Sequence, residues 1–94
     1  MWTVAALYRF ATVDDPVALK TALSQVCADH DVCGTLILAH EGINGTIAAP
    51  TRENMQAVLD QIVPRFPGIE LKMSGAKDKP FKRLKIKVKP EIVT

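Results

Sequence analysis

Two stretches of the sequence combine residue types that could do ligand or acid–base chemistry, and the first is Cys27-x2-His30-x2-Cys33. It offers three potential soft-metal ligands, but no fourth ligand is nearby, and Cys27 and His30 fall on an apolar helical stripe. Neither thiol has an adjacent base that would activate it as a nucleophile. We therefore expect buried, reduced thiols, a helix-end histidine and no metal site.

The second stretch, residues 40–45, places a histidine, a carboxylate and an amide in one glycine-flexed loop between two expected strands. Acid–base catalysis by such a loop is conceivable. Composition alone favours a simpler interpretation, in which the glycines and the Asn-Gly pair satisfy a hairpin more elaborate than a two-residue turn. A docking surface for another domain would use the same residues. The loop with a possible functional or docking role comprises His40, Glu41, Gly42, Asn44 and Gly45.

A self-contained hydrolase of the acylphosphatase type is a third possibility. Its site requires an anion-binding loop with an arginine after the first strand and an asparagine that positions water, for which Arg9 and Asn44 are the nearest candidates. The first strand instead leads into Asp14-Asp15, whose charges would repel phosphate, and a glycine-rich loop is missing. The sequence thus favours a chain that contains no catalytic site of its own.

Charge is sorted along the chain. Residues 72–89 carry eight basic side chains and one acid (+7), residues 1–71 carry four basic and eight acidic side chains (−4), and Glu91 supplies the last −1. Such asymmetry indicates a segment that faces a polyanion. No aromatic pair of the type that RNA-recognition motifs use accompanies it, so we expect contact with a nucleic-acid backbone rather than base stacking. The expected contact residues are Lys77, Lys79, Lys82, Arg83, Lys85, Lys87 and Lys89.

Three of these lysines define a lysine row: Lys85, Lys87 and Lys89 alternate with apolar residues and would stand about 7 Å apart on one side of a strand. Phosphates along a nucleic acid have a similar spacing. The alternative is an edge strand that its lysines protect from aggregation.

The helices and strands that must position these residues follow from the periodicity of apolar residues and from the residues that begin or end each element. Strands are expected over 2–10, 35–39, 43–49, 69–74 and 81–89. Asp15-Pro16 and Thr51 mark the starts of two helices with one apolar stripe each. The order β-α-β-β-α-β with an extra strand predicts an α+β ferredoxin-like sandwich, in which both helices cover one face of an antiparallel sheet. Acylphosphatase is one version of this architecture.

Size and composition limit the classes of protein to which the chain can belong. Ninety-four residues form one domain, and the apolar (48%) and charged (23%) fractions exclude disordered and collagen-like chains. The sequence contains neither an apolar run of about 18 residues nor a signal-peptide pattern, so we expect no membrane association and a cytoplasmic location. The extended, β-prone segment 90–94 favours a domain border there.

Most of the sequence resembles one known family. The likeness lies in Leu7-Tyr8-Arg9-Phe10, in the run from Gly34 to Ala48 with its core Ala39-His40-Glu41-Gly42-Ile43-Asn44, and in the run from Phe81 to Val93. These motifs are similar to the amino-terminal domain of the bacterial rhodanese-domain tRNA uridine hydroxylases. The resemblance implies oxygen-dependent formation of 5-hydroxyuridine at the tRNA wobble position, with molecular oxygen as co-substrate of the whole enzyme and no cofactor in this domain.

The same resemblance implies that catalysis lies elsewhere in the polypeptide. In that family the catalytic cysteine belongs to a following rhodanese domain, within a Cys-x-Gly-Gly-Ile-Arg-Cys loop, and neither Cys27 nor Cys33 matches it. The leading hypothesis is therefore that this domain holds tRNA. The alternative is a structural and interaction module that covers the rhodanese active site through the 40–45 loop.

Overall fold

The computed structural model describes residues 1–93 and contains the predicted elements in the predicted order. A short 3-10 helix follows the second α-helix and ends at the turn before the fourth strand. The elements are β1 Trp2–Phe10, α1 Pro16–Asp29, β2 Cys33–Ala39, β3 Gly42–Ala49, α2 Arg52–Ile62, η1 Val63–Arg65, β4 Glu70–Ala76 and β5 Leu84–Val88.

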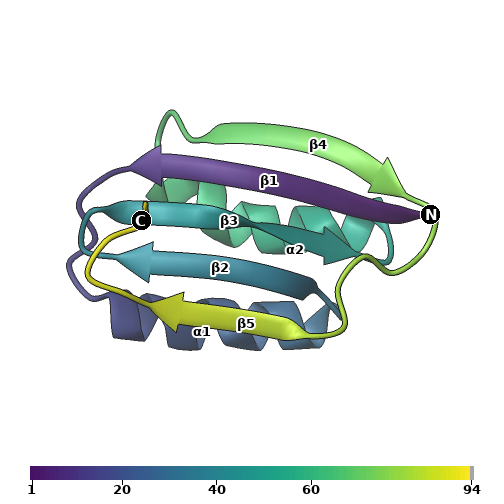
Figure 1. The fold of residues 1–94 in the computed structure, drawn as a ribbon, viewed down its shortest axis with the longest axis horizontal. Helices are drawn as coiled ribbons and strands as arrows, with labels where there is room; N and C mark the ends of the chain where they lie inside the picture. The colour runs from purple at the N-terminus through teal and green to yellow at the C-terminus, as the bar shows by residue number, and fades with distance from the viewer. Residues whose placement is uncertain (94) are drawn as a thin grey trace.

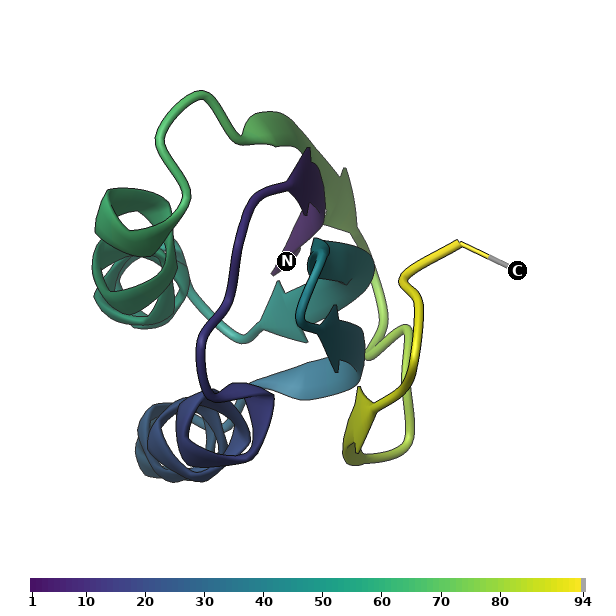
Figure 2. The ribbon, with the colours of Figure 1, turned by 90° about the vertical axis from the view of Figure 1, so that its left-hand side faces the viewer.

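The five strands form one sheet in the order β4-β1-β3-β2-β5, and both helices pack on the same face of it (Figures 1 and 2). The ferredoxin-like sandwich is therefore confirmed. The four strands of the βαββαβ unit pair antiparallel, whereas β5 pairs parallel with β2, so the sheet as a whole is mixed rather than antiparallel. The parallel pairing arises because β5 is reached from β4, which lies at the opposite edge.

Both helices begin where the sequence predicts. The Asp15 carboxylate accepts a hydrogen bond from the Ala18 amide at 3.0 Å, and Pro16 occupies the first helical position of α1. The Thr51 hydroxyl caps α2 by accepting from the Asn54 amide at 3.1 Å. Each side chain satisfies one of the amide groups that the first turn of a helix leaves unpaired.

The core lies between the helices and one face of the sheet. Ala5 and Leu7 of β1 point into it, with isoleucines and leucines of β2, β3 and β5 beside them. Alternation therefore places the other set of β1 residues, which contains Tyr8 and Phe10, on the face that the helices do not cover. We call this side of the sheet the open face. The sequence predicts β1 as a strand, but its aromatic residues Tyr8 and Phe10 lie on the open face and not in the core.

The loop between β2 and β3 is shorter than predicted. Ala39 pairs with Gly42, so His40 and Glu41 form a two-residue connection, and Asn44-Gly45 lies within β3. The Asn-Gly pair was thus wrongly interpreted as part of the turn. Gly42 is needed because its φ is +150° and a Cβ there would lie 2.0 Å from the Arg9 carbonyl oxygen of β1.

Other strand boundaries also differ from prediction. Gly34 lies inside β2 rather than before it, and β4 extends to Ala76. The last strand covers only Leu84–Val88 of the expected 81–89, because residues 77–83 must cross from one edge of the sheet to the other. That crossing spans about 19 Å, four strand spacings, in seven residues, which reach about 23–25 Å when fully extended.

After β5 the chain does not continue as an extended strand. Residues 90–93 turn back over the open face, on the side of the sheet opposite the helices (Figure 2). The Ile92 side chain is only 1% exposed although it is not a member of the main core. It therefore packs against the open face. Thr94, the last residue of the segment predicted to be extended, lies outside the described residues.

No helix within residues 1–93 has the length and apolar composition that a membrane span requires.

We expect Gly42→Ala to lower the free energy of unfolding by about 2–4 kcal/mol, because its Cβ would meet the backbone of β1 in a conformation that alanine rarely adopts. Urea titration would measure this. Gly75→Ala on β4 is the control, since its Cβ would crowd only the flexible Met1 side chain, and we expect a change within about 1 kcal/mol. Equal effects of the two substitutions would contradict the steric explanation.

Candidate functional site

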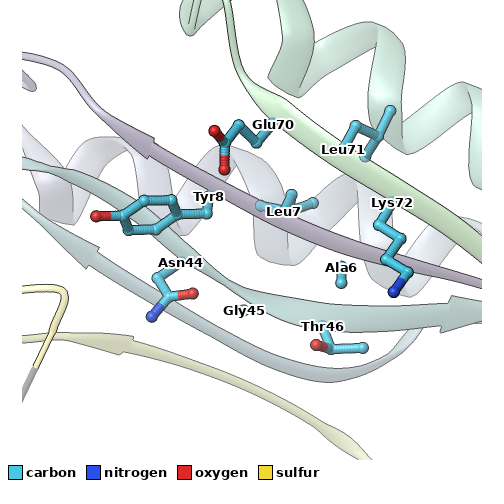
Figure 3. A pocket seen from close by; sticks show the side chains of 9 residues that line it. All are labelled: Ala6, Leu7, Tyr8, Asn44, Gly45, Thr46, Glu70, Leu71 and Lys72. Atoms are coloured by element: carbon cyan, nitrogen blue, oxygen red, sulfur yellow. The ribbon is translucent and has the colours of Figure 1, made fainter.

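The open face contains a shallow hollow of about 320 Å³ between β1, β3 and β4 (Figure 3). Register explains its composition: Tyr8 pairs with Asn44 on one side and Glu70 on the other, and Ala6 pairs with Thr46 and Lys72. An aromatic ring, an amide and a carboxylate therefore lie at one end, and a hydroxyl and an ammonium group lie at the other.

The predicted basic residues lie around the margin of the open face. Lys85 and Lys87 of β5 pair with Thr35 and Ile37 of β2, so their side chains leave the sheet on the open side, as Leu84 and Ile86 turn toward the core. The 77–83 crossing carries four more basic residues past the end of the sheet (Figure 1). Together with Lys72 they form a basic rim, all of it exposed: Lys72, Lys77, Lys79, Lys82, Arg83, Lys85, Lys87 and Lys89.

The crossing is attached to the sheet at two points that the sequence did not reveal. The Lys79 ammonium lies 5.8 Å from the centroid of the Trp2 ring, within the range of a cation–π contact. The Arg83 carbonyl accepts a hydrogen bond from the Gly34 amide at 3.0 Å, which starts the β2–β5 pairing. The basic crossing is thus held near both edges of the sheet.

The polar residues of the 40–45 segment, of which His40 and Glu41 form the connection and Asn44 lies in β3, have separate hydrogen-bond partners. His40 Nδ1 donates to the Val13 carbonyl at 2.9 Å and so ties the hairpin to the segment before α1. The Glu41 carboxylate accepts from the Ile92 amide at 3.4 Å, and Asn44 Nδ2 donates to the Ile92 carbonyl at 3.0 Å. Glu41 and Asn44 therefore hold both backbone groups of Ile92, and we call this pair the Ile92 clamp.

The two candidate residues for an acylphosphatase site do not come together. Arg9 alternates with Tyr8 along β1, and Asn44 pairs with Tyr8, so Arg9 and Asn44 project from opposite faces of the sheet. The Arg9 guanidinium packs on Gly68, where an added Cβ would lie 3.2 Å from its Cζ. Asn44 is engaged by Ile92. This geometry argues against a hydrolytic site built from the pair.

The cysteines and His30 occupy structural positions. Cys27 is fully buried in the core, and burial raises the pKa of its thiol from 9.0 to about 11, which disfavours the reactive thiolate. Cys33 is also a free, buried thiol and lies 3.7 Å from the Ala48 carbonyl oxygen. His30 Nδ1 donates to Asn54 Oδ1 at 3.0 Å. Within residues 1–93, no three histidine, cysteine or carboxylate side chains converge as a metal site would require.

Four of the residues that line the hollow have polar or aromatic side chains and were not predicted from sequence as site residues: Tyr8, Thr46, Glu70 and Lys72. Each belongs to a strand that was predicted, but alternation alone does not tell which face a helix covers. The signal that could have found them is the shared alternation of β1 and β4: Leu7 and Leu71 lie on one face, so Tyr8 and Lys72 lie on the other.

The fold is that of acylphosphatase-like domains. Solved structures that resemble it include full-length HypF in the phosphate- and nucleotide-bound form (TM-score 0.68, 12% identity, 99% of this chain and 13% of that one). Acylphosphatase from Bacillus subtilis matches with a TM-score of 0.65 and 11% identity over 92% of this chain and 98% of that one. At such low identity the likeness shows the fold and not the activity.

The chain belongs to the family of the UPF0176 acylphosphatase-like domain, whose model matches residues 2–92. Relatives named tRNA uridine(34) hydroxylase include proteins of Mesorhizobium japonicum (47% identical over 93 residues) and Rhizobium leguminosarum (50% over 93 residues). Each match covers 97% of this chain and 30% of the relative. The predicted family resemblance is confirmed, and the chain spans about 30% of the length of these relatives.

The Ile92 clamp can be tested directly. Residues 90–93 form the tail of the described chain. We expect Asn44→Ala to raise the hydrogen-exchange rate of the Ile92 amide about tenfold, because removing a hydrogen bond to the tail costs about 1–1.5 kcal/mol. NMR-detected exchange would show this. Asn54→Ala is the control, since it removes one asparagine bond from α2 and leaves the tail untouched. An unchanged Ile92 rate in Asn44→Ala would contradict the clamp.

Proposed function

We propose that this domain is the tRNA-holding part of a tRNA uridine(34) hydroxylase, and that the chemistry of hydroxylation belongs to another part of the longer protein. The observation that carries the proposal is the basic rim on the open face of a domain whose relatives bear that enzyme name. Hydroxylation of uridine by the whole enzyme would use molecular oxygen. The cytoplasm, where tRNA is found, is the expected location.

Charge distribution supports the choice of surface. The basic rim contributes eight positive side chains to the open side and its margins, while α1 and the residues that flank it carry Asp14, Asp15, Asp29 and Asp31 against Lys20. The charge that was sorted in the sequence is thus sorted in space, with a cationic sheet side and an anionic helix α1. A polyanion approaching this domain would be steered to the sheet.

The chemistry of the described residues supports a holding rather than a catalytic role. The one thiol with a shifted pKa is buried and shifted away from reactivity, and the residues of the 40–45 loop bind backbone groups of this same chain. A following domain, of the rhodanese type by resemblance, would supply the catalytic cysteine.

Charge reversal of the lysine row tests the proposal. Lys85, Lys87 and Lys89 all changed to Glu should weaken tRNA binding at least tenfold and lower the slope of log affinity against log salt by about 0.7–0.9 for each phosphate that the domain no longer binds. Filter binding at several salt concentrations would measure both. Changing Lys20, Arg52 and Arg65 of the helical layer to Glu is the matched control, with the same change in net charge. Equally weakened binding in the two variants, or unchanged binding in the first, would reject the proposal.

A second candidate function rests on the Ile92 clamp. Because Glu41 and Asn44 hold the tail on the open face, the 40–45 segment could set how the neighbouring part of the enzyme sits over this domain. In the full hydroxylase, His40→Ala combined with Glu41→Ala should then lower turnover while tRNA affinity persists. Unchanged turnover would exclude this role, and a joint fall in affinity and turnover would point to tRNA contact instead.

A further inference from the structure

The hollow on the open face has the chemistry of a binding site for a single unpaired RNA base. We infer that Tyr8 stacks on such a base, while Lys72 binds the adjoining phosphate. This inference rests on the proposed function and deepens it, because it adds base contact to a surface for which the sequence indicated backbone contact only.

The aromatic platform comes from β1. Tyr8 and Phe10 lie on the same side of the sheet with ring centroids 5.3 Å apart in an edge-to-face arrangement, and Phe10 is 53% exposed. The two rings are nearly perpendicular, at 76°, so Phe10 contacts the Tyr8 ring without lying flat on it. Aromatic rings on the open face of a sheet are the usual stacking platforms for unpaired bases, and each stacked base adds substantially to affinity.

The Ile92 clamp fixes the polarity of Asn44. A carbonyl oxygen can only accept, so Asn44 Nδ2 must face the Ile92 carbonyl, and Oδ1 must point the other way. Figure 3 shows this oxygen directed toward the Gly45–Thr46 side, within the lining of the hollow. With Glu70 across the hollow, two acceptors flank Tyr8, which suits the N–H donors on a base edge.

The end of the hollow that contains Lys72 is suited to a phosphate. Lys72 pairs with Ala6, which lies two residues, or about 7 Å along β1, from Tyr8. Glu70 pairs with Tyr8 itself and would repel a phosphate there. The base is therefore placed at the Tyr8 end and the phosphate at the Lys72 end. The small Ala6 side chain leaves the floor between them clear (Figure 3).

The test compares a ten-nucleotide single-stranded RNA with an RNA duplex of the same length, using fluorescence anisotropy. Tyr8→Ala should weaken binding of the single strand about 5- to 100-fold, the effect expected for one stacked base, and leave the duplex unchanged. Tyr8→Phe keeps the ring and should stay within about twofold of the original affinity. Equal behaviour of Tyr8→Ala and the original protein on the single strand would overturn the inference.

Two further measurements separate this inference from the proposed function and from misfolding. The charge-reversed lysine row should weaken both RNAs; if it does and Tyr8→Ala does not, the base site is wrong and the tRNA-holding role stands. If neither variant matters, the proposed function fails. In the unaltered protein, uridine 5′-monophosphate should shift the NMR signals of the Asn44 side-chain amide and the Thr46 amide, and unperturbed signals at saturating nucleotide would overturn the base site without any substitution.

Discussion

The structure depends on one constraint, which is that a sheet of five strands is covered by only two helices on one side. Burial of apolar side chains on that face stabilises the fold, and within residues 1–93 the other face is covered only at its margin. The open face therefore accepts residues that a core would reject, such as Lys72, Glu70 and Asn44. The candidate site therefore lies on the face of the sheet that the helices leave uncovered.

The margins of the open face are closed by segments that the core does not need. At one end the 77–83 crossing carries basic side chains past the sheet and is anchored through Lys79 and Trp2. At the other end residues 90–93 fold back and are held by the Ile92 clamp. Cations thus collect at one end and along β5, whereas the clamped end contains Glu41 and Glu91, so the electrostatic field across the face is uneven.

Local chemistry made much of the fold predictable from sequence. Asp15 and Thr51 cap helices because their side chains reach amides three residues ahead, and such signals need no tertiary information. The parallel pairing of β5 and the return of Ile92 depend on contacts about fifty positions apart, which periodicity does not encode. Asn44-Gly45 misled for a related reason, because a turn-forming pair can serve a strand where backbones approach closely. The basic residues were found by counting charge, whereas Tyr8 and Lys72 needed the knowledge of which face is open.

The parallel strand β5 has a consequence for how this domain opens. Among the strands it pairs with β2 alone, and its first pair, Gly34 with Leu84, closes a loop of about fifty residues. The four antiparallel strands pair with one another without it, so β5 and residues 90–93 can open as a local unit, at the cost of the β2–β5 pairs and the burial of Ile86. The lysine row is therefore carried by an edge strand that can open while the other four strands stay paired. A ligand that binds the row would bias this opening equilibrium, and the domain would become more rigid when it is loaded than when it is free.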